Sequence, residues 1–194
     1  MRGARLLVFV FLLVVAAAGW PADRAPLFAQ LEKTRHIAEG AQNPRSVLYV
    51  FFDPNCYYCN LTWRALQPYE RAGLQVRWVP VAYQKENSAG MAAAMMLAPD
   101  PAAALRENET RYKPENYDGG IKPLATVPAQ FGNALKQNLS LMRRFGAPGT
   151  PALVWKDAKG RIAFRNAVPR LSELPRITGL PAQRIDDPDL ADFR

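Results

Sequence analysis

The pattern of apolar and polar residues divides the chain into short segments that predict either a strand or a helix. A continuous apolar run at residues 47–52, rich in β-branched and aromatic side chains, is too short for a helix and predicts a buried central strand. At residues 56–71 the apolar side chains recur at helical spacing, and Gly73 then ends the predicted helix. Alternation returns at residues 74–83 and predicts a second strand. Because these strands flank one helix, we expect them to pair in parallel through a right-handed crossover.

The second half of the chain predicts several helices and a hairpin. The predicted helices cover residues 88–98, 102–112, 128–145 and 172–178. The predicted strands cover residues 152–155 and 162–164. Ser88 is a candidate N-terminal cap for the first of these helices. Gly160, between the two strands, suits the left-handed position of a hairpin loop.

The order of these elements predicts an α/β sandwich at residues 46–181. In it, a helical insertion at about residues 86–146 separates a βαβ unit from a C-terminal ββα unit. Residues 19–45 show only weak helical periodicity, and we interpret them as an N-terminal helix and linker. Residues 182–194 form an acidic tail that we expect to be loose.

The first residues have the pattern of a secretory signal peptide. Arg2 and Arg5 precede an unbroken apolar run at residues 6–18 that ends in three alanines, so we predict a cleaved signal peptide at residues 1–18. An uncleaved membrane anchor is the alternative. In both cases the positive N-terminus predicts export of the remaining chain, into a compartment where disulfides persist.

Composition and charge exclude several classes of protein. The chain has 194 residues, of which 49% are hydrophobic and 22% charged, and these values exclude a fibrous, a wholly disordered or a multi-pass membrane protein. The formal net charge of +8 falls to +6 without Arg2 and Arg5. The remaining basic residues are interleaved with acidic ones, and no basic stripe with stacking aromatic residues indicates a nucleic-acid partner.

Two cysteines carry the candidate chemistry. Cys56-Tyr57-Tyr58-Cys59 stands where a predicted strand turns into a predicted helix. A thiol at a helix N-terminus is stabilised as thiolate, so we expect the pKa of Cys56 to lie below the usual value of about 8.5. Cys56 is then the exposed nucleophile and Cys59 the more buried resolving thiol. Asp53 either ends the strand or caps the helix, or it acts on the thiol through its charge.

Three other interpretations of the cysteine pair compete with redox chemistry. A structural disulfide would close only a very short loop and would stabilise the fold weakly. A zinc site would need further ligands, and the chain holds one histidine, His36, and no third cysteine. A copper(I) site could use the thiolates with Met91, Met95 and Met96, although methionines on an alanine-rich helix more often pack in a core. We therefore predict a redox pair without metal or cofactor.

Two segments resemble a known family. Residues 51–59 (Phe-Phe-Asp-Pro-Asn-Cys-Tyr-Tyr-Cys) and 146–152 (Gly-Ala-Pro-Gly-Thr-Pro-Ala) are similar to thioredoxin-fold proteins, and among them to the periplasmic disulfide isomerases of the DsbC/DsbG type. The resemblance extends from about residue 36 to residue 181 and implies a thioredoxin-like fold. It also implies that Pro151 is a cis-proline that faces the cysteines, with Thr150 beside it.

The resemblance to the DsbG side of that family is greater, because threonine precedes the cis-proline and a tyrosine, Tyr58, is third in the motif. Tyr57 stands where the family usually has proline, which leaves the redox direction open. The family's N-terminal dimerisation domain has no counterpart between the signal peptide and the first strand. We therefore expect a monomer, and isomerase activity is an open question.

These observations predict a periplasmic thiol–disulfide oxidoreductase. Cys56 and Cys59 would form the redox-active disulfide, while Tyr57, Tyr58 and the Thr150–Pro151 backbone would contact substrate. The expected substrates are exported proteins with a disulfide or an oxidised cysteine, and the resemblance implies recycling by a membrane thiol reductant of the DsbD type. The alternatives are a DsbA-like disulfide donor and a non-enzymatic chaperone or copper(I)-binding module.

Overall fold

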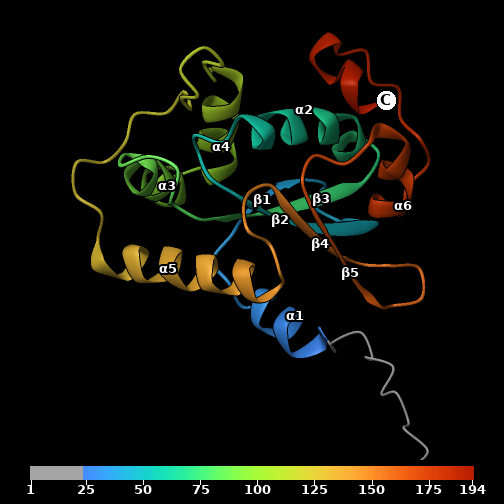
Figure 1. Cartoon of the computed structure of the whole chain (residues 1–194), viewed down its shortest axis with the longest axis horizontal. Helices are drawn as coiled ribbons and strands as arrows, with labels where there is room; N and C mark the ends of the chain where they lie inside the picture. Colours follow the sequence, from blue (N-terminus) through green and yellow to red (C-terminus); the bar gives the residue numbers. More distant parts are fainter. Residues whose placement is uncertain (1–23) are drawn as a thin grey trace, which may run out of the picture.

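The computed structural model describes residues 24–194 and shows one five-stranded sheet with helices on both faces (Figure 1). The strands are β1 (Ile37–Gly40), β2 (Ser46–Phe52), β3 (Leu74–Pro80), β4 (Ala152–Lys156) and β5 (Ile162–Asn166). The helices are α1 (Ala25–Leu31), α2 (Tyr57–Arg71), α3 (Ser88–Leu97), α4 (Pro101–Thr110), α5 (Ala129–Arg144) and α6 (Leu174–Thr178). Two short 3₁₀ turns follow later in the chain, η1 (Leu171–Glu173) and η2 (Pro188–Phe193). The predicted signal peptide lies outside the described residues.

The sheet has the strand order β1-β3-β2-β4-β5. β2 and β3 are parallel and are joined through α2, which confirms the predicted βαβ unit. β4 pairs antiparallel with β2, and β5 pairs antiparallel with β4, so the C-terminal hairpin extends the same sheet. Gly160 has a φ of +74° in the hairpin loop, as predicted.

β1 was not predicted from the sequence, where its residues were assigned to a linker. It pairs antiparallel with β3, and only Ile37 and Glu39 point into the protein. A four-residue strand with one apolar inward residue is too short to show an alternating pattern. Glu39 is tolerated there because it accepts a hydrogen bond from Nε1 of Trp63 at 2.9 Å.

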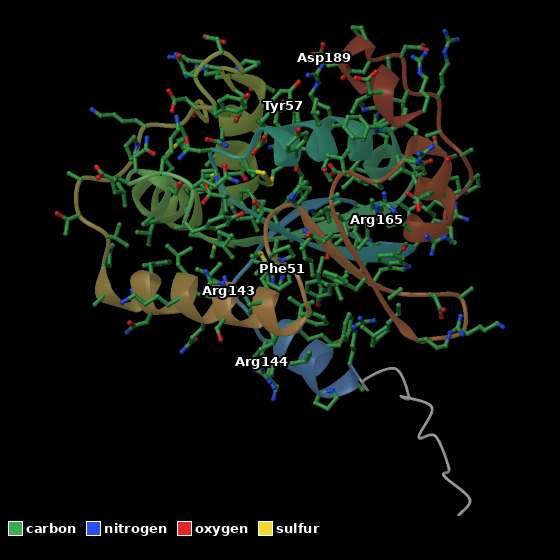
Figure 2. The ribbon with its side chains drawn as sticks, in the orientation of Figure 1. Phe51, Tyr57, Arg143, Arg144, Arg165 and Asp189 are labelled. Carbon is green, nitrogen blue, oxygen red and sulfur yellow. A yellow bond between two sulfur atoms is a disulfide. The ribbon has the colours of Figure 1, made fainter. Side chains whose placement is uncertain are left out.

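The side chains of β2 alternate between two buried layers, which explains its continuous apolar run. Leu48, Val50 and Phe52 pack with α2 and α6 on one face. Tyr49 and Phe51 pack with α1 and α5 on the other, and Figure 2 places Phe51 between the sheet and α5. The parallel strands β2 and β3 therefore lie at the centre of the fold, and α2 starts from the carboxyl edge of β2.

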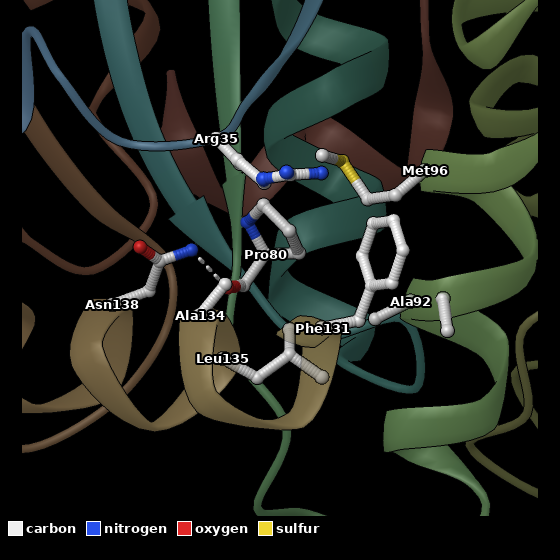
Figure 3. Close-up of a pocket in the computed structure, with 9 residues that line it drawn as sticks. Arg35, Pro80, Ala92, Met96, Phe131, Ala134, Leu135 and Asn138 are labelled. Carbon is white, nitrogen blue, oxygen red and sulfur yellow. Dashed lines mark hydrogen bonds between the residues drawn. The ribbon is translucent and has the colours of Figure 1, made fainter. Parts of the chain in front are cut away.

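The helical insertion packs closely against β3. Nδ2 of Asn138 donates a hydrogen bond to the carbonyl oxygen of Pro80 at 2.9 Å, and the guanidinium of Arg35 lies 5.0 Å from the ring centre of Phe131 (Figure 3). The space left between these side chains is about 10 Å³, which is no larger than a water molecule requires. This junction is therefore a packing contact, with no room for a ligand.

The C-terminal tail is ordered against α2, so the expectation of a loose tail is wrong. The side chain of Leu190 is fully buried. Nη2 of Arg64 on α2 lies 2.6 Å from Oδ1 of Asp187, and Nη1 lies 2.9 Å from Oδ2 of Asp189. Figure 2 labels Asp189 on the same side of the sheet as α2. One buried leucine and two ion pairs to a distant arginine therefore hold this segment in place, although its own composition resembles that of a flexible tail. Within residues 24–194, no helix is both long enough and apolar enough to cross a membrane.

Candidate active site

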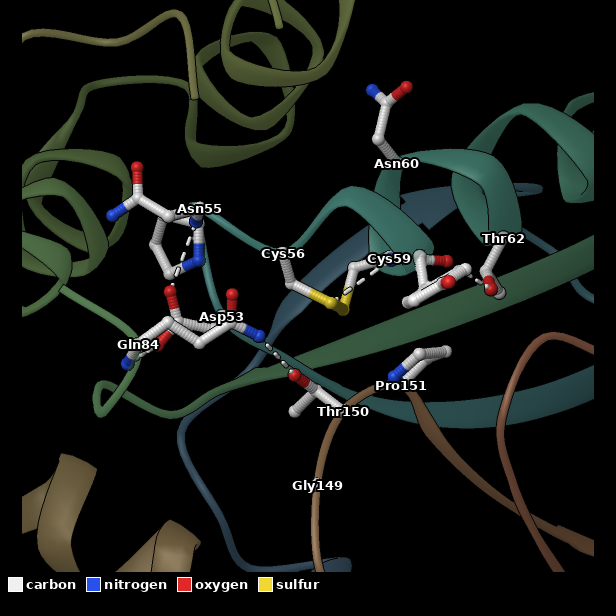
Figure 4. Close-up of a disulfide and its surroundings, with 12 residues drawn as sticks. Asp53, Asn55, Cys56, Cys59, Asn60, Thr62, Gln84, Gly149, Thr150 and Pro151 are labelled. Carbon is white, nitrogen blue, oxygen red and sulfur yellow. Dashed lines mark hydrogen bonds between the residues drawn. A yellow bond between two sulfur atoms is a disulfide. The ribbon is translucent and has the colours of Figure 1, made fainter. Parts of the chain in front are cut away.

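The two cysteines form a disulfide at the start of α2 (Figure 4). Their Cα atoms are 5.1 Å apart. Cys56 is the N-cap residue, in an extended conformation with φ −81° and ψ 109°, and its Sγ accepts a hydrogen bond from the backbone N–H of Cys59 at 3.1 Å. The helix therefore begins at Tyr57 rather than at Cys56. Position and contact both favour a negative charge on this sulfur when the disulfide opens.

Both cysteines are buried in this oxidised state. Cys56 is 2% exposed and Cys59 is 1% exposed, so the expectation that Cys56 is openly exposed is wrong for the disulfide form. Both side chains belong to the apolar cluster that joins β2 to α2. The exposure of a thiol depends on what packs over it, and that packing comes from distant parts of the chain.

Asp53 is a fully buried carboxylate that joins three segments next to the disulfide. Oδ1 accepts hydrogen bonds from the N–H of Asn55 at 3.0 Å and from Oγ of Ser88 at 2.8 Å. Oδ2 accepts from the N–H of Tyr83 at 2.9 Å and of Gln84 at 3.1 Å. Asp53 is therefore the hub of the loops after β2 and β3, while Cys56 itself caps α2.

Ser88 does not cap α3, in contrast to the sequence prediction. The N-cap residue is Asn87, and no side chain caps this helix. The Ser88 hydroxyl is buried and donates to Asp53, while it accepts from Nδ2 of Asn55 at 2.9 Å. The carboxylate of Asp53 is a strong acceptor for the Ser88 hydroxyl, and only the tertiary fold brings the two groups together.

The insertion holds the loop that precedes the cysteines. The Tyr112 hydroxyl donates to the carbonyl oxygen of Asn55 at 2.8 Å, and Nδ2 of Asn108 donates to that of Pro54 at 3.1 Å. Burial raises the pKa of Tyr112 above its ordinary value, so this hydroxyl keeps its proton. The N–H of Gly119 donates to Oδ1 of Asn55 at 3.2 Å. None of these contacts was predicted, because all of them join distant positions.

The Thr150–Pro151 peptide bond is cis, and the loop that contains it faces the disulfide (Figure 4). The backbone N–H of Thr150 donates to the Tyr83 hydroxyl at 2.9 Å, and Nε2 of Gln84 donates to Oγ1 of Thr150 at 3.2 Å. Nδ2 of Asn166 donates to the carbonyl oxygens of Gly149 at 2.7 Å and Pro151 at 3.0 Å. The loop is thus fixed from both sides.

Sequence reasoning missed Tyr83, Gln84 and Asn166 as parts of this site. A usable signal was present for the first two residues, because they follow a strand that is parallel to β2. The carboxyl ends of neighbouring parallel strands meet at one edge of a sheet, so residues just after β3 lie near residues just after β2. The same signal applied to Asn166. It ends β5, which runs in the direction of β2 because both strands pair antiparallel with β4, so its carboxyl end lies at the same edge.

The two tyrosines of the motif have different surroundings. Tyr58 is 55% exposed, while Tyr57 is partly buried. The Tyr57 ring lies 6.3 Å from that of Tyr112 and 6.0 Å from that of Tyr117, both of which belong to the insertion. Tyr58 therefore offers a free aromatic surface beside the disulfide, and Tyr57 links the start of α2 to the insertion.

A buried carboxyl group joins α2 to α4 next to the second cysteine. Nδ2 of Asn60 donates to Oε2 of Glu109 at 2.9 Å and to its carbonyl oxygen at 2.8 Å, and Nδ2 of Asn108 donates to Oε1 at 3.0 Å. Burial raises the pKa of Glu109 to about 7, although these amides oppose the rise. The group anchors the insertion on the helix that carries the cysteines.

Comparison with known proteins identifies the fold. A family model described as a thioredoxin-like domain matches residues 31–169. The chain belongs to the thioredoxin-like family. Its fold, with the buried disulfide at a helix start and the cis-proline opposite, confirms the resemblance drawn from the sequence.

Curated relatives of this thioredoxin-like chain include disulfide interchange proteins. It is 34% identical over 154 residues to the thiol:disulfide interchange protein DsbG of Pseudomonas aeruginosa, covering 79% of this chain and 59% of that protein. It is 32% identical over 124 residues to the thiol:disulfide interchange protein DsbC of Haemophilus influenzae, covering 63% of this chain and 49% of that protein. The chain thus spans about half of the length of these relatives.

Among solved structures, a periplasmic thioredoxin-like protein from Salmonella enterica serovar Typhimurium superposes with a TM-score of 0.61 at 21% identity. The match covers 79% of this chain and 94% of that protein. This likeness concerns the fold alone.

The other candidate residues, namely His36, Met91, Met95 and Met96, are partly or fully buried in the fold. Nδ1 of His36 lies 3.0 Å from the Thr34 carbonyl oxygen, and burial lowers the pKa of the ring. Met91 and Met95 are buried. Within residues 24–194, no group of histidine, cysteine and acidic side chains is arranged to hold a metal ion.

Proposed function

We propose that this protein is a thiol–disulfide oxidoreductase, with Cys56 and Cys59 as its catalytic pair. The observation that carries the proposal is the Cys56–Cys59 disulfide at the N-terminus of α2, opposite a cis-proline loop. The curated relatives named as disulfide interchange proteins support the same chemistry. The short loop between the cysteines stabilises the fold only weakly, which disfavours a purely structural disulfide.

The proposed reaction is a thiol–disulfide exchange that transfers two electrons from the protein to its substrate. In the reduced protein, the Cys56 thiolate attacks one sulfur of a substrate disulfide, and the other substrate sulfur leaves as a thiolate. The Cys59 thiolate then attacks Sγ of Cys56, which restores the Cys56–Cys59 disulfide and releases the second substrate thiolate. Both released thiolates take protons from solvent. The substrate is reduced, and the protein is oxidised to the state that the structure shows.

The loop at Thr150 and Pro151 is the proposed contact for the substrate backbone. It lies opposite the disulfide and is held rigid by Tyr83, Gln84 and Asn166. A rigid loop lowers the entropy that is lost when an extended substrate segment is ordered against it. Tyr58 adds an exposed aromatic surface, and the centre of its ring lies 5.5 Å from that of Tyr57.

The proposed setting is the periplasm. The predicted signal peptide at residues 1–18 supports export. The proposed substrates are exported proteins with a disulfide or an oxidised cysteine. We propose that the protein works as a monomer and that a membrane thiol reductant of the DsbD type supplies electrons for each new cycle.

The test is to trap the mixed disulfide. In Cys59→Ala the resolving thiol is absent, so substrate proteins remain attached to Cys56 and can be identified after non-reducing electrophoresis. The matched control is the double variant Cys56→Ala/Cys59→Ala, which should trap none. The proposal is overturned if Cys59→Ala traps no exported protein and the reduced wild-type protein does not reduce a peptide disulfide.

A further inference from the structure

The C-terminal tail forms one wall of a pocket beside the proposed substrate loop. This pocket has a volume of about 380 Å³, and Phe193 of the tail lines it together with Tyr58, Pro151 and Val168. Three separate parts of the chain thus meet there: the first turn of α2, the cis-proline loop with the end of β5, and the last residues of the chain. The pocket lies next to the disulfide, because Tyr58 stands between the two cysteines.

The lining of this pocket is apolar, and no charged side chain contributes to it. Asn166 is one of its few polar residues, but its amide nitrogen is engaged with the carbonyl oxygens of Gly149 and Pro151. Tyr58 and Phe193 contribute ring surface that water contacts in the free protein. An apolar side chain that enters would bury this surface, whereas a polar one would lose hydrogen bonds to water without replacement.

The other flank of the loop has the opposite character. There the Tyr83 hydroxyl and Nε2 of Gln84 both lie within hydrogen-bond distance of Oγ1 of Thr150. Figure 4 shows Gln84 on one side of Thr150 and Pro151 on the other. A substrate segment that crosses the loop therefore meets polar groups on one side of its cysteine and the apolar pocket on the other.

The tail is held in place by contacts outside the pocket. Arg64 binds Asp187 and Asp189, and Leu190 is fully buried three residues before Phe193. Asp187 also accepts a hydrogen bond from the N–H of Asp189 at 3.0 Å, which caps η2. These contacts fix the turn that presents the Phe193 ring, so the wall is preformed.

We infer that this pocket binds an apolar or aromatic side chain adjacent to the reactive cysteine of the substrate, and that Phe193 determines this preference. Arg64 acts as a positioning residue, because it holds the segment that carries Phe193 and does not line the pocket. The inference rests on the proposed function and names the class of substrate that it selects.

The experiment uses homodimeric peptide disulfides that differ at one position next to the cysteine. That position is leucine, phenylalanine, serine or asparagine, so net charge is constant, and it is placed before the cysteine in one series and after it in the other. The rate constant for reduction by the reduced protein is divided by the rate constant with dithiothreitol, which removes intrinsic differences in reactivity. We expect the apolar peptides of one series to react about tenfold faster than the polar ones.

Variants of Phe193 and Arg64 test whether the tail determines the preference for apolar peptides. Phe193→Ala should lower the ratio of apolar to polar rates to about one, and Arg64→Ala should lower it in part. Arg64→Lys should restore less than the wild-type ratio, because an ammonium group does not match two carboxylates at once. The control is Leu97→Ala, which removes an exposed apolar side chain from α3 and should keep the ratio unchanged. Melting curves of each variant establish that it is folded.

The outcomes separate the two proposals. If all peptides react at equal normalised rates with the wild-type protein, or if Phe193→Ala keeps the full preference, the inference is overturned and the proposed function stands. If no peptide is reduced by the wild-type protein, the proposed function fails and the inference fails with it. A preference that is confined to one series and lost in Phe193→Ala supports the inference.

Discussion

The hydroxyl of Tyr83 accepts a hydrogen bond from the backbone N–H of Thr150 at 2.9 Å, across 67 positions of sequence. The same oxygen lies 3.0 Å from Oγ1 of Thr150. The loop after β3 thus supports the peptide that precedes the cis-proline. Because Asp53 binds the N–H of Tyr83, the support continues to the loop in front of the cysteines. The two halves of the site are therefore coupled through one tyrosine.

Tyr83→Phe removes this acceptor and keeps the ring. We expect a fall of about 1 kcal/mol in the free energy of unfolding and a fall of about fivefold in the rate of peptide disulfide reduction, because the Thr150 amide loses its partner and the loop loses its support. Urea denaturation and the peptide assay measure both effects. Tyr117→Phe is the matched control, since that side chain is 58% exposed. Equal rates for Tyr83→Phe and wild type would contradict the supporting role.

Asp53→Ala tests the hub next to the disulfide. The substitution leaves four donors without their acceptor, namely the N–H groups of Asn55, Tyr83 and Gln84 and the hydroxyl of Ser88. We expect the free energy of unfolding to fall by about 3 kcal/mol or more, because unpaired buried donors are costly. Urea denaturation of the oxidised protein measures this change.

The control for Asp53 is Asp186→Ala, which removes an exposed carboxylate whose partner, Arg184, is also exposed. Its effect should stay within about 0.5 kcal/mol. A loss below about 1 kcal/mol for Asp53→Ala would show that the donors find other partners.

Leu190→Ala tests whether the tail belongs to the core. The side chain is fully buried beside α2, so truncation should lower the free energy of unfolding by about 2 to 4 kcal/mol and expose the tail to limited proteolysis. Leu97→Ala, at a position that is 47% exposed, should change stability by less than about 0.5 kcal/mol. A tail that is cut equally fast in the wild-type protein and in Leu190→Ala would contradict the docked arrangement.

The raised pKa of Glu70 predicts how the stability of the protein depends on pH. Burial, together with the neighbouring charge of Glu39, raises the pKa of Glu70 from 4.5 to about 8. The folded protein therefore keeps a proton that the unfolded chain releases above pH 4.5 or so. Stability should fall as the pH rises from about 5 to about 8, and level off above that range. Glu109, with its pKa raised to about 7, acts in the same direction.

Glu70→Gln removes the ionisation. We expect the variant to gain stability relative to wild type by about 2 kcal/mol between pH 5 and pH 8, since each unit of pKa difference corresponds to about 1.4 kcal/mol and relaxation reduces the full effect. Urea denaturation at a series of pH values gives the slope. Glu107→Gln, an exposed residue paired with Arg111, should keep the wild-type slope. An unchanged slope in Glu70→Gln would show that this carboxyl ionises normally.

The elements that local patterns predict well are those whose signals lie within a few residues. The run at residues 47–52 became β2, and the helical spacing after Cys56 became α2. β1 escaped prediction because its pairing with β3 depends on a partner about forty positions away and its own pattern is only four residues long. Ser88 was misassigned for a related reason, because its partner Asp53 is 35 positions away.

The sequence by itself determined the disulfide pair, the helix that starts beside it and the Thr150–Pro151 loop. Each of these depends on residues within one short segment: two thiols one helical turn apart, or a proline after a threonine. Only the tertiary structure decided that the cysteines are buried, that Tyr83 supports Thr150 and that the tail lies on α2. These contacts join residues that are 67 positions apart for Tyr83 and Thr150, and 125 apart for Arg64 and Asp189. Their strength depends on burial and on opposite charges brought together by folding, which no local pattern records.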